Sequence, residues 1–72
     1  MLQETELAVL KIDLPEYRLK AGDVGTVVLV HGRKGYEVEF MTLDGEMVAM
    51  ASLQAAQVRP IRSREVAHVR SI

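Results

Sequence analysis

The sequence predicts one small all-β domain of five short antiparallel strands, and three observations predict it. The chain has 72 residues, 49% of them hydrophobic, which is the composition of a globular protein in a length that holds a single domain. Short runs of β-branched and aliphatic residues recur along it, and such runs favour strands. Glycine-containing turns separate the later runs, and such turns join antiparallel neighbours.

The first expected strand covers residues 7–12, a mostly aliphatic run. Pro15 follows it, and proline removes a backbone donor and biases the preceding residue toward extended geometry. Residues 13–21 are therefore predicted to form a loop. We expect Leu14, Tyr17 and Leu19 to hold this loop against the rest of the domain.

The next two strands are predicted from a turn, a hairpin and a clear alternation. Gly22-Asp23-Val24-Gly25 predicts a turn, because Gly and Asp tolerate positive φ. Residues 26–31 then give the strongest strand signal, and the two glycines of residues 32–35 close a hairpin. In residues 36–41, large apolar side chains alternate with two glutamates and Met41, which is typical of a half-buried antiparallel strand.

The remaining elements complete a known architecture. Asp44-Gly45 predicts a hairpin turn, residues 47–51 a fourth strand, and residues 52–56 one helical turn with Ser52 as its N-cap. Residues 57–61 are expected to form the last strand, and Pro60 places that strand at an edge or marks its end. This order predicts a partly open SH3-like barrel over residues 1–61. An OB-fold is the less favoured rival, because it usually has longer strands and a helix between the third and fourth.

Residues 62–72 form a separate basic tail. From residue 59 onward there are four Arg and one Glu, a net charge of +3, whereas the first 58 residues have a net charge of −4. The tail contains Arg62, Arg64 and Arg70, and its apolar side chains are compatible with either a helix or a strand. We expect its arginines either to contact an acidic surface of this chain, with Glu37 and Glu39 as the obvious local acceptors, or to reach for an acidic partner.

Three separated blocks of the chain resemble a known family. They are residues 13–28, which include Leu-Lys-Ala-Gly-Asp-Val-Gly-Thr-Val-Val, residues 36–46 and residues 53–61. Their order is similar to that of the small, mostly bacterial proteins filed as domain of unknown function 4926, and the likeness covers about residues 6–61. It implies a short stand-alone SH3-like protein without an agreed activity. Some members lie beside toxin-like genes.

The composition and motifs argue against several classes of function. A net charge of −1 excludes a strongly basic nucleic-acid binder, and the chain has no cysteine for a thiolate site. His31 and His68 lie 37 residues apart, without the spacing of metal ligands. No serine has the context of a hydrolase nucleophile. We therefore expect a non-enzymatic protein without a cofactor or metal.

Methionines supply the strongest indication of a binding surface. Met41, Met47 and Met50 fall on adjacent strands, and methionine suits adaptable interfaces. The fourth strand is apolar on both faces, so we expect both faces to be covered, one by the core and the other by a protein partner or the tail. A chain this short without disulfides favours a homo-oligomer. The candidate partner-binding residues are Met41, Met47, Met50, Arg62, Arg64, Val66, Val69 and Arg70.

Two functions compete on these observations. The first is a protein-interaction module and, as the family resemblance implies, an antitoxin-like bacterial protein that binds and neutralises a toxin-like product of a neighbouring gene. The alternative is an RNA- or ribosome-associated module similar to KOW domains, which would use Arg33, Lys34 and the tail. The acidic start lacks the order of a signal peptide and no apolar run is long enough to span a membrane, so we expect a cytoplasmic location.

Overall fold

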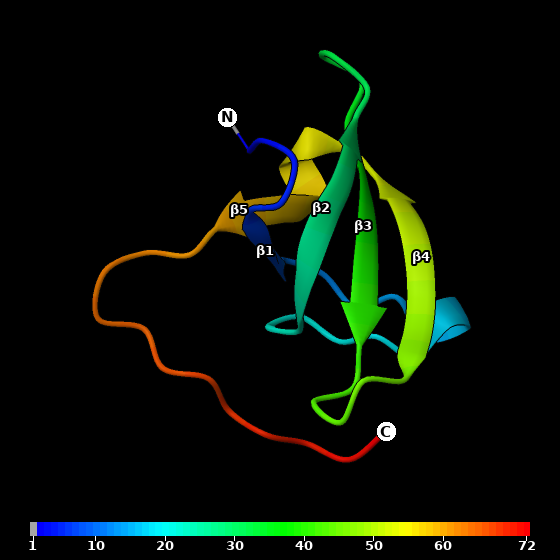
Figure 1. Ribbon diagram of the computed structural model, residues 1–72, viewed down its shortest axis with the longest axis vertical. Coiled ribbons are helices and arrows are strands. Elements are labelled where there is room, and N and C mark those ends of the chain that lie inside the picture. The colour runs from blue at the N-terminus through cyan, green and yellow to red at the C-terminus, as the bar shows by residue number, and fades with distance from the viewer. Residues whose placement is uncertain (1) are drawn as a thin grey trace.

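The computed structural model describes residues 2–72 as a five-stranded antiparallel sheet with the strand order β4-β3-β2-β1-β5 (Figure 1). The two edge strands, β4 and β5, do not pair with each other, so the barrel is partly open. The predicted all-β fold is confirmed. The strands are β1 (Leu7–Leu10), β2 (Val24–Val30), β3 (Tyr36–Met41), β4 (Met47–Leu53) and β5 (Val58–Pro60), and two 3-10 turns are η1 (Pro15–Tyr17) and η2 (Ala55–Gln57).

One face of the sheet encloses the hydrophobic core. Tyr36, Val38 and Phe40 alternate inward along β3, as their spacing predicts, and all three are buried. The Tyr36 hydroxyl also accepts a hydrogen bond from the Leu2 backbone N–H at 3.3 Å, so the polar end of this ring is satisfied within the core. The remaining core members are Leu2, Ala8, Leu10, Leu14, Leu19, Val27, Ala51, Leu53 and Val58.

The pairing of β1 with β5 joins the two ends of the domain. Ala8 lies opposite Pro60, and Leu10 lies opposite Val58. Pro60 is the last residue of an edge strand, where the missing N–H disrupts no central ladder. The prediction of a short edge strand at this position is confirmed.

The segment predicted as a loop contains a feature that the sequence reading missed. Pro15 opens η1, where the fixed φ of proline suits the first position, and Leu14 and Leu19 form an isolated bridge beneath it. Both leucines are buried, as expected, whereas Tyr17 is 39% exposed. Asp13 accepts a hydrogen bond from the backbone of Ala21 at 2.9 Å, which fixes the end of the loop.

The predicted helical turn begins later than the sequence indicated. Ser52 was expected to be its N-cap, but β4 continues through Leu53 and includes Ser52. Gln54 is the N-cap of η2 instead, and Gln54 and Gln57 form a reciprocal capping box. A serine is a good N-cap in isolation, but its pairing with Glu37 in the sheet decides its position here.

The tail forms neither of the structures that its spacing allowed. Residues 61–72 contain no helix and no strand. The segment leaves β5, runs clear of the sheet and returns to end below β3 and β4 in the view of Figure 1. Among residues 2–72, no helix has the length and apolar character needed to cross a membrane.

Candidate interaction surface

The second face of the sheet, opposite the core, is defined by cross-strand pairs. Glu39 of β3 lies between Thr26 of β2 and Met50 of β4. One step along, Glu37 lies between Leu29 and Ser52. Paired residues share a face of a sheet. These rows therefore place two carboxylates in the middle of this face, each between one apolar and one hydroxyl-bearing neighbour.

We call this surface the outer face and define it by the exposed apolar residues around Glu37 and Glu39. Met41, Met47 and Met50 are 47%, 61% and 44% exposed. The structure therefore gathers the three predicted methionines on one surface, and Met41 pairs directly with Met47. The sequence reading missed the other members: Leu7, Val24, Val28 and Leu29, each 39–51% exposed.

Two β-bulges determine which side chains reach the outer face. In the pairing of β2 with β3, the register shifts between Val27 and Leu29. In the pairing of β3 with β4, it shifts between Phe40 and Met41. An extra residue in a strand changes the phase of the alternation. Met47 and Met50 consequently lie on the same face, although an uninterrupted period of two would put one of them in the core. Both methionines are therefore part of the outer face.

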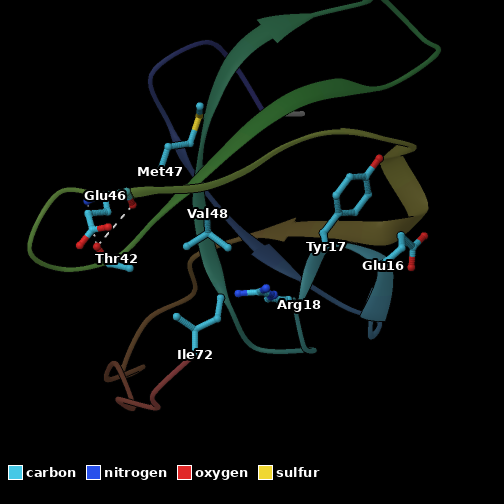
Figure 2. Close-up of a pocket in the computed structure, with 8 residues that line it drawn as sticks. All are labelled: Glu16, Tyr17, Arg18, Thr42, Glu46, Met47, Val48 and Ile72. Carbon is cyan, nitrogen blue, oxygen red and sulfur yellow. Dashed lines mark hydrogen bonds between the residues drawn. The ribbon is translucent and has the colours of Figure 1, made fainter.

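Val48 is the extra residue of the second bulge: Ala49 and Met47 on either side of it pair with β3, and Val48 does not. It packs against the core cluster, and in Figure 2 its side chain points to the opposite side of β4 from Met47. It lines an open cavity of about 330 Å³ with η1 and the end of the tail. The lining residues are Glu16, Tyr17, Arg18, Thr42, Glu46, Met47, Val48 and Ile72.

A small polar cluster occupies one end of the outer face. Ser52 donates a hydrogen bond to Glu37 Oε2 at 2.5 Å, and His31 Nε2 lies 2.9 Å from the same oxygen. The Ser52 hydrogen bond and then the His31 contact lower the pKa of Glu37. The serine and the histidine both contact the carboxylate rather than each other, so this cluster is not arranged as a nucleophile with its base.

The tail is attached to the barrel first by Glu65. Arg59 donates two hydrogen bonds to its carboxylate, at 2.9 and 2.6 Å, and the Arg62 backbone N–H donates a third at 2.5 Å. The Arg59 hydrogen bonds, followed by the one from Arg62, lower the pKa of Glu65 to about 2. A carboxylate that accepts several such bonds is strongly held in its charged form.

The second attachment is Arg70. It donates to the two oxygens of Asp23 at 2.9 and 2.5 Å and to the Arg18 carbonyl at 2.9 Å. Burial raises the pKa of Asp23, but the hydrogen bonds from Arg70 and the Lys20 backbone outweigh it and the net pKa is lowered. The expected acceptors, Glu37 and Glu39, are wrong, because a loop folded around Asp23 offers a partly buried bidentate site.

The structure keeps the other predicted site residues apart from the methionines. Val66 is 93% exposed and Val69 is 71% exposed, and the side chains of Arg62 and Arg64 form no ion pair among residues 2–72. Arg33 and Lys34 lie at the tip of the β2–β3 hairpin. Within residues 2–72, no group of three or more His, Asp or Glu residues is arranged to hold a metal.

The missed residues of β2 have a signal in the sequence. The run Thr-Val-Val-Leu-Val is apolar on both faces, as is the strand that contains Met47 and Met50. A strand apolar on both faces is expected to be covered on both. Strand β2, like β4, is therefore expected to be covered on both faces, and this expectation identifies Val28 and Leu29 as members of the outer face.

Comparison with known proteins identifies a family and nothing more specific. No curated protein and no solved structure matches the chain. Residues 4–60 match the family described as Domain of unknown function (DUF4926). The match covers all five strands and both 3-10 turns, and it includes every residue of the outer face. On this evidence the chain belongs to the DUF4926 family.

Proposed function

We propose that this protein is a non-enzymatic protein-interaction module that binds its partner through the outer face. The observation that carries the proposal is the gathering of Met41, Met47 and Met50 beside Val28 and Leu29 on an exposed sheet face. Contiguous exposed apolar surface on a small domain is typical of a binding site. Methionine side chains adapt to the shape of a partner.

The edge of the sheet supports the same proposal. Strand β4 spans Met47–Leu53 and contains neither a charged residue nor a proline, whereas β5 is three residues long, carries Arg59 and ends in Pro60. Natural proteins commonly protect a free edge with charges, prolines or short strands. Since β4 lacks all three, it suits a partner that extends over the outer face to the edge.

The finer form of the proposal is an antitoxin-like role in the bacterial cytoplasm. It rests on what the family resemblance implies, a place beside a toxin-like gene, and it makes the product of a neighbouring gene the first partner to test. The RNA- or ribosome-associated alternative relies on the tail and on Arg33 and Lys34. These two charges lie on a hairpin tip, and the outer face adds acidic rather than basic side chains to them.

The test is co-purification of the neighbouring gene product with the tagged chain. Met50→Glu should abolish it, because a buried unpaired carboxylate is costly. Leu43→Glu is the matched control, since Leu43 is 90% exposed and lies outside the outer face. Equal retention by wild type and Met50→Glu would reject the proposal.

Salt separates the two candidate functions. Binding through apolar surface should persist at high salt, whereas nucleic-acid binding should weaken steeply, because phosphate contacts release counterions. Binding to RNA oligonucleotides that is lost in Arg33→Glu would favour the alternative.

A further inference from the structure

Residues 61–69 form an exposed segment that is fastened near both ends. We call this segment the arm. Within the arm, Glu65 accepts hydrogen bonds from Arg59. Directly after the arm, Arg70 donates hydrogen bonds to Asp23. Among residues 2–72, the hydrogen bonds of the arm involve only Glu65, with Arg59 and the Arg62 backbone. Figure 1 shows this part of the chain running clear of the sheet.

The arm exposes apolar and cationic groups together. Val66 and Val69 are 93% and 71% exposed, so the rest of the chain covers little of either. Arg62 and Arg64 add two cations without an ion-pair partner among residues 2–72. An exposed valine pair flanked by unpaired arginines fits a surface that is both apolar and acidic.

The backbone presents Arg64 in a fixed way. Its φ of 64° lies in the left-handed region, which non-glycine residues adopt uncommonly. The neighbouring Glu65 carboxylate, bonded to Arg59 and to the Arg62 N–H, closes this turn. A binding segment that is already ordered loses less conformational freedom when it docks.

The outer face has the complementary chemistry. Glu39 is half-buried between Thr26 and Met50 and has no ion pair among residues 2–72. A partly buried carboxylate that has no cation beside it favours a cation brought by a partner. Two outer faces packed directly on each other would instead bring like charges together, and such contacts are unfavourable.

We propose that the outer face takes the arm of a second copy of this chain. Arg64 pairs with Glu39 of the second copy, and Val66 and Val69 cover Met50 and its apolar neighbours. Each copy carries both surfaces, and the inference is that two copies exchange arms reciprocally, which is the arrangement that closes as a two-fold dimer. This inference rests on the proposed function of the outer face and names the occupant of that face in the absence of the neighbouring gene product.

The arm of the same chain does not fit this role. Its start follows β5, the edge strand farthest from β4 in the sheet order, and its end is held at Asp23 by Arg70. To reach Glu39 of its own sheet the arm would have to release these contacts. A second copy reaches the same position while both attachments stay intact.

The test is a charge reversal carried out on two separate chains. Glu39→Arg alone and Arg64→Glu alone should each weaken dimerisation at least about tenfold in sedimentation experiments, as expected for close interfacial charges. An equimolar mixture of the two variants should restore it, because each Arg then meets a Glu at both contacts of the mixed dimer. Thermal unfolding checks that every variant is folded.

Two further variants keep the test decisive. Arg64→Gly removes the charge, suits the left-handed backbone and should weaken dimerisation as Arg64→Glu does. Arg33→Glu, at the hairpin tip, is the matched control and should leave the dimer unchanged. A folded wild-type chain that stays monomeric at all concentrations overturns the inference, as does a mixture that fails to restore dimerisation.

The outcome separates this inference from the proposed function. If the arm is wrong and the outer face is right, Met50→Glu still abolishes co-purification of the neighbouring gene product while the charge reversals have no effect. If the outer face itself is wrong, Met50→Glu also leaves binding unchanged.

Discussion

Gly35 shows how one residue can fix the junction between two strands. Its φ of 142° is a conformation that side chains rarely adopt, and an added Cβ would overlap the Leu53 carbonyl. Gly45 also has a positive φ, of 98°, but an added Cβ there would meet nothing within 4 Å. The two glycines therefore share a backbone constraint and differ in the space around them.

Gly35→Ala should destabilise the fold by more than about 3 kcal/mol, because backbone must move to relieve the overlap. Gly45→Ala should cost only about 1–2 kcal/mol, the penalty of the backbone conformation alone. Urea unfolding of both variants measures the difference. Equal losses would mean that the close approach to Leu53 contributes nothing.

Glu65 gives the tail a defined response to acid. Its pKa is lowered from the ordinary 4.5 to about 2 by Arg59 and the Arg62 N–H. A lowered pKa means that the attachment is fully formed above about pH 4.5 and is lost as the pH falls through 2. An NMR titration of the Glu65 carboxyl and the Arg62 amide should therefore show both changing together near pH 2. A Glu65 transition near pH 4.5 would contradict this prediction.

Strand β4 separates two kinds of surface within one element. Met50 is 44% exposed and Ala51 is fully buried. Ala51→Glu should unfold the barrel, at a cost above about 3 kcal/mol, because it buries an unpaired carboxylate. Met50→Glu should cost only about 0.2–1 kcal/mol, the effect of a like charge opposite Glu39. Thermal unfolding compares the two. A similar loss in both would show that the outer face is covered within the chain.

The tail should be separable from the stability of the barrel. Residues 63–72 form no backbone–backbone hydrogen bond with the strands among residues 2–72. Deleting residues 63–72 should therefore leave the thermal midpoint of the dilute protein close to that of the full chain, while dimerisation is lost. A large drop in the midpoint at low concentration would show that the tail supports the fold itself.

The elements of the sheet were largely predictable from the sequence, whereas their contacts were not. Alternation along Tyr36–Met41 and the turn at Gly45 are local signals, so the third and fourth strands were placed well. The bulge at Val48 depends on the fit of β4 against the core and leaves no mark in the residue pattern. The partners of Arg70 and Glu65 depend on where a tail without secondary structure returns to the barrel, and periodicity says nothing about that.

At the scale of the whole molecule, the two faces of one sheet differ in how far they are covered. The core face is closed by large apolar side chains, and the other face keeps Met41, Met47 and Met50 in solvent. The basic arm emerges from the opposite edge strand. The chain thus separates a receptive surface from the segment proposed to fill it, and this separation favours association between copies.

The pairing of β1 with β5 also bears on the order in which the chain folds. Strands β2, β3 and β4 are joined by short turns, whereas β1 and β5 come from opposite ends of the domain, and long closures are formed slowly. We expect the β2–β3–β4 meander to be formed already in the folding transition state and the β1–β5 pair to form afterwards. In stopped-flow kinetics, Val38→Ala should slow folding, whereas Val58→Ala should mainly accelerate unfolding.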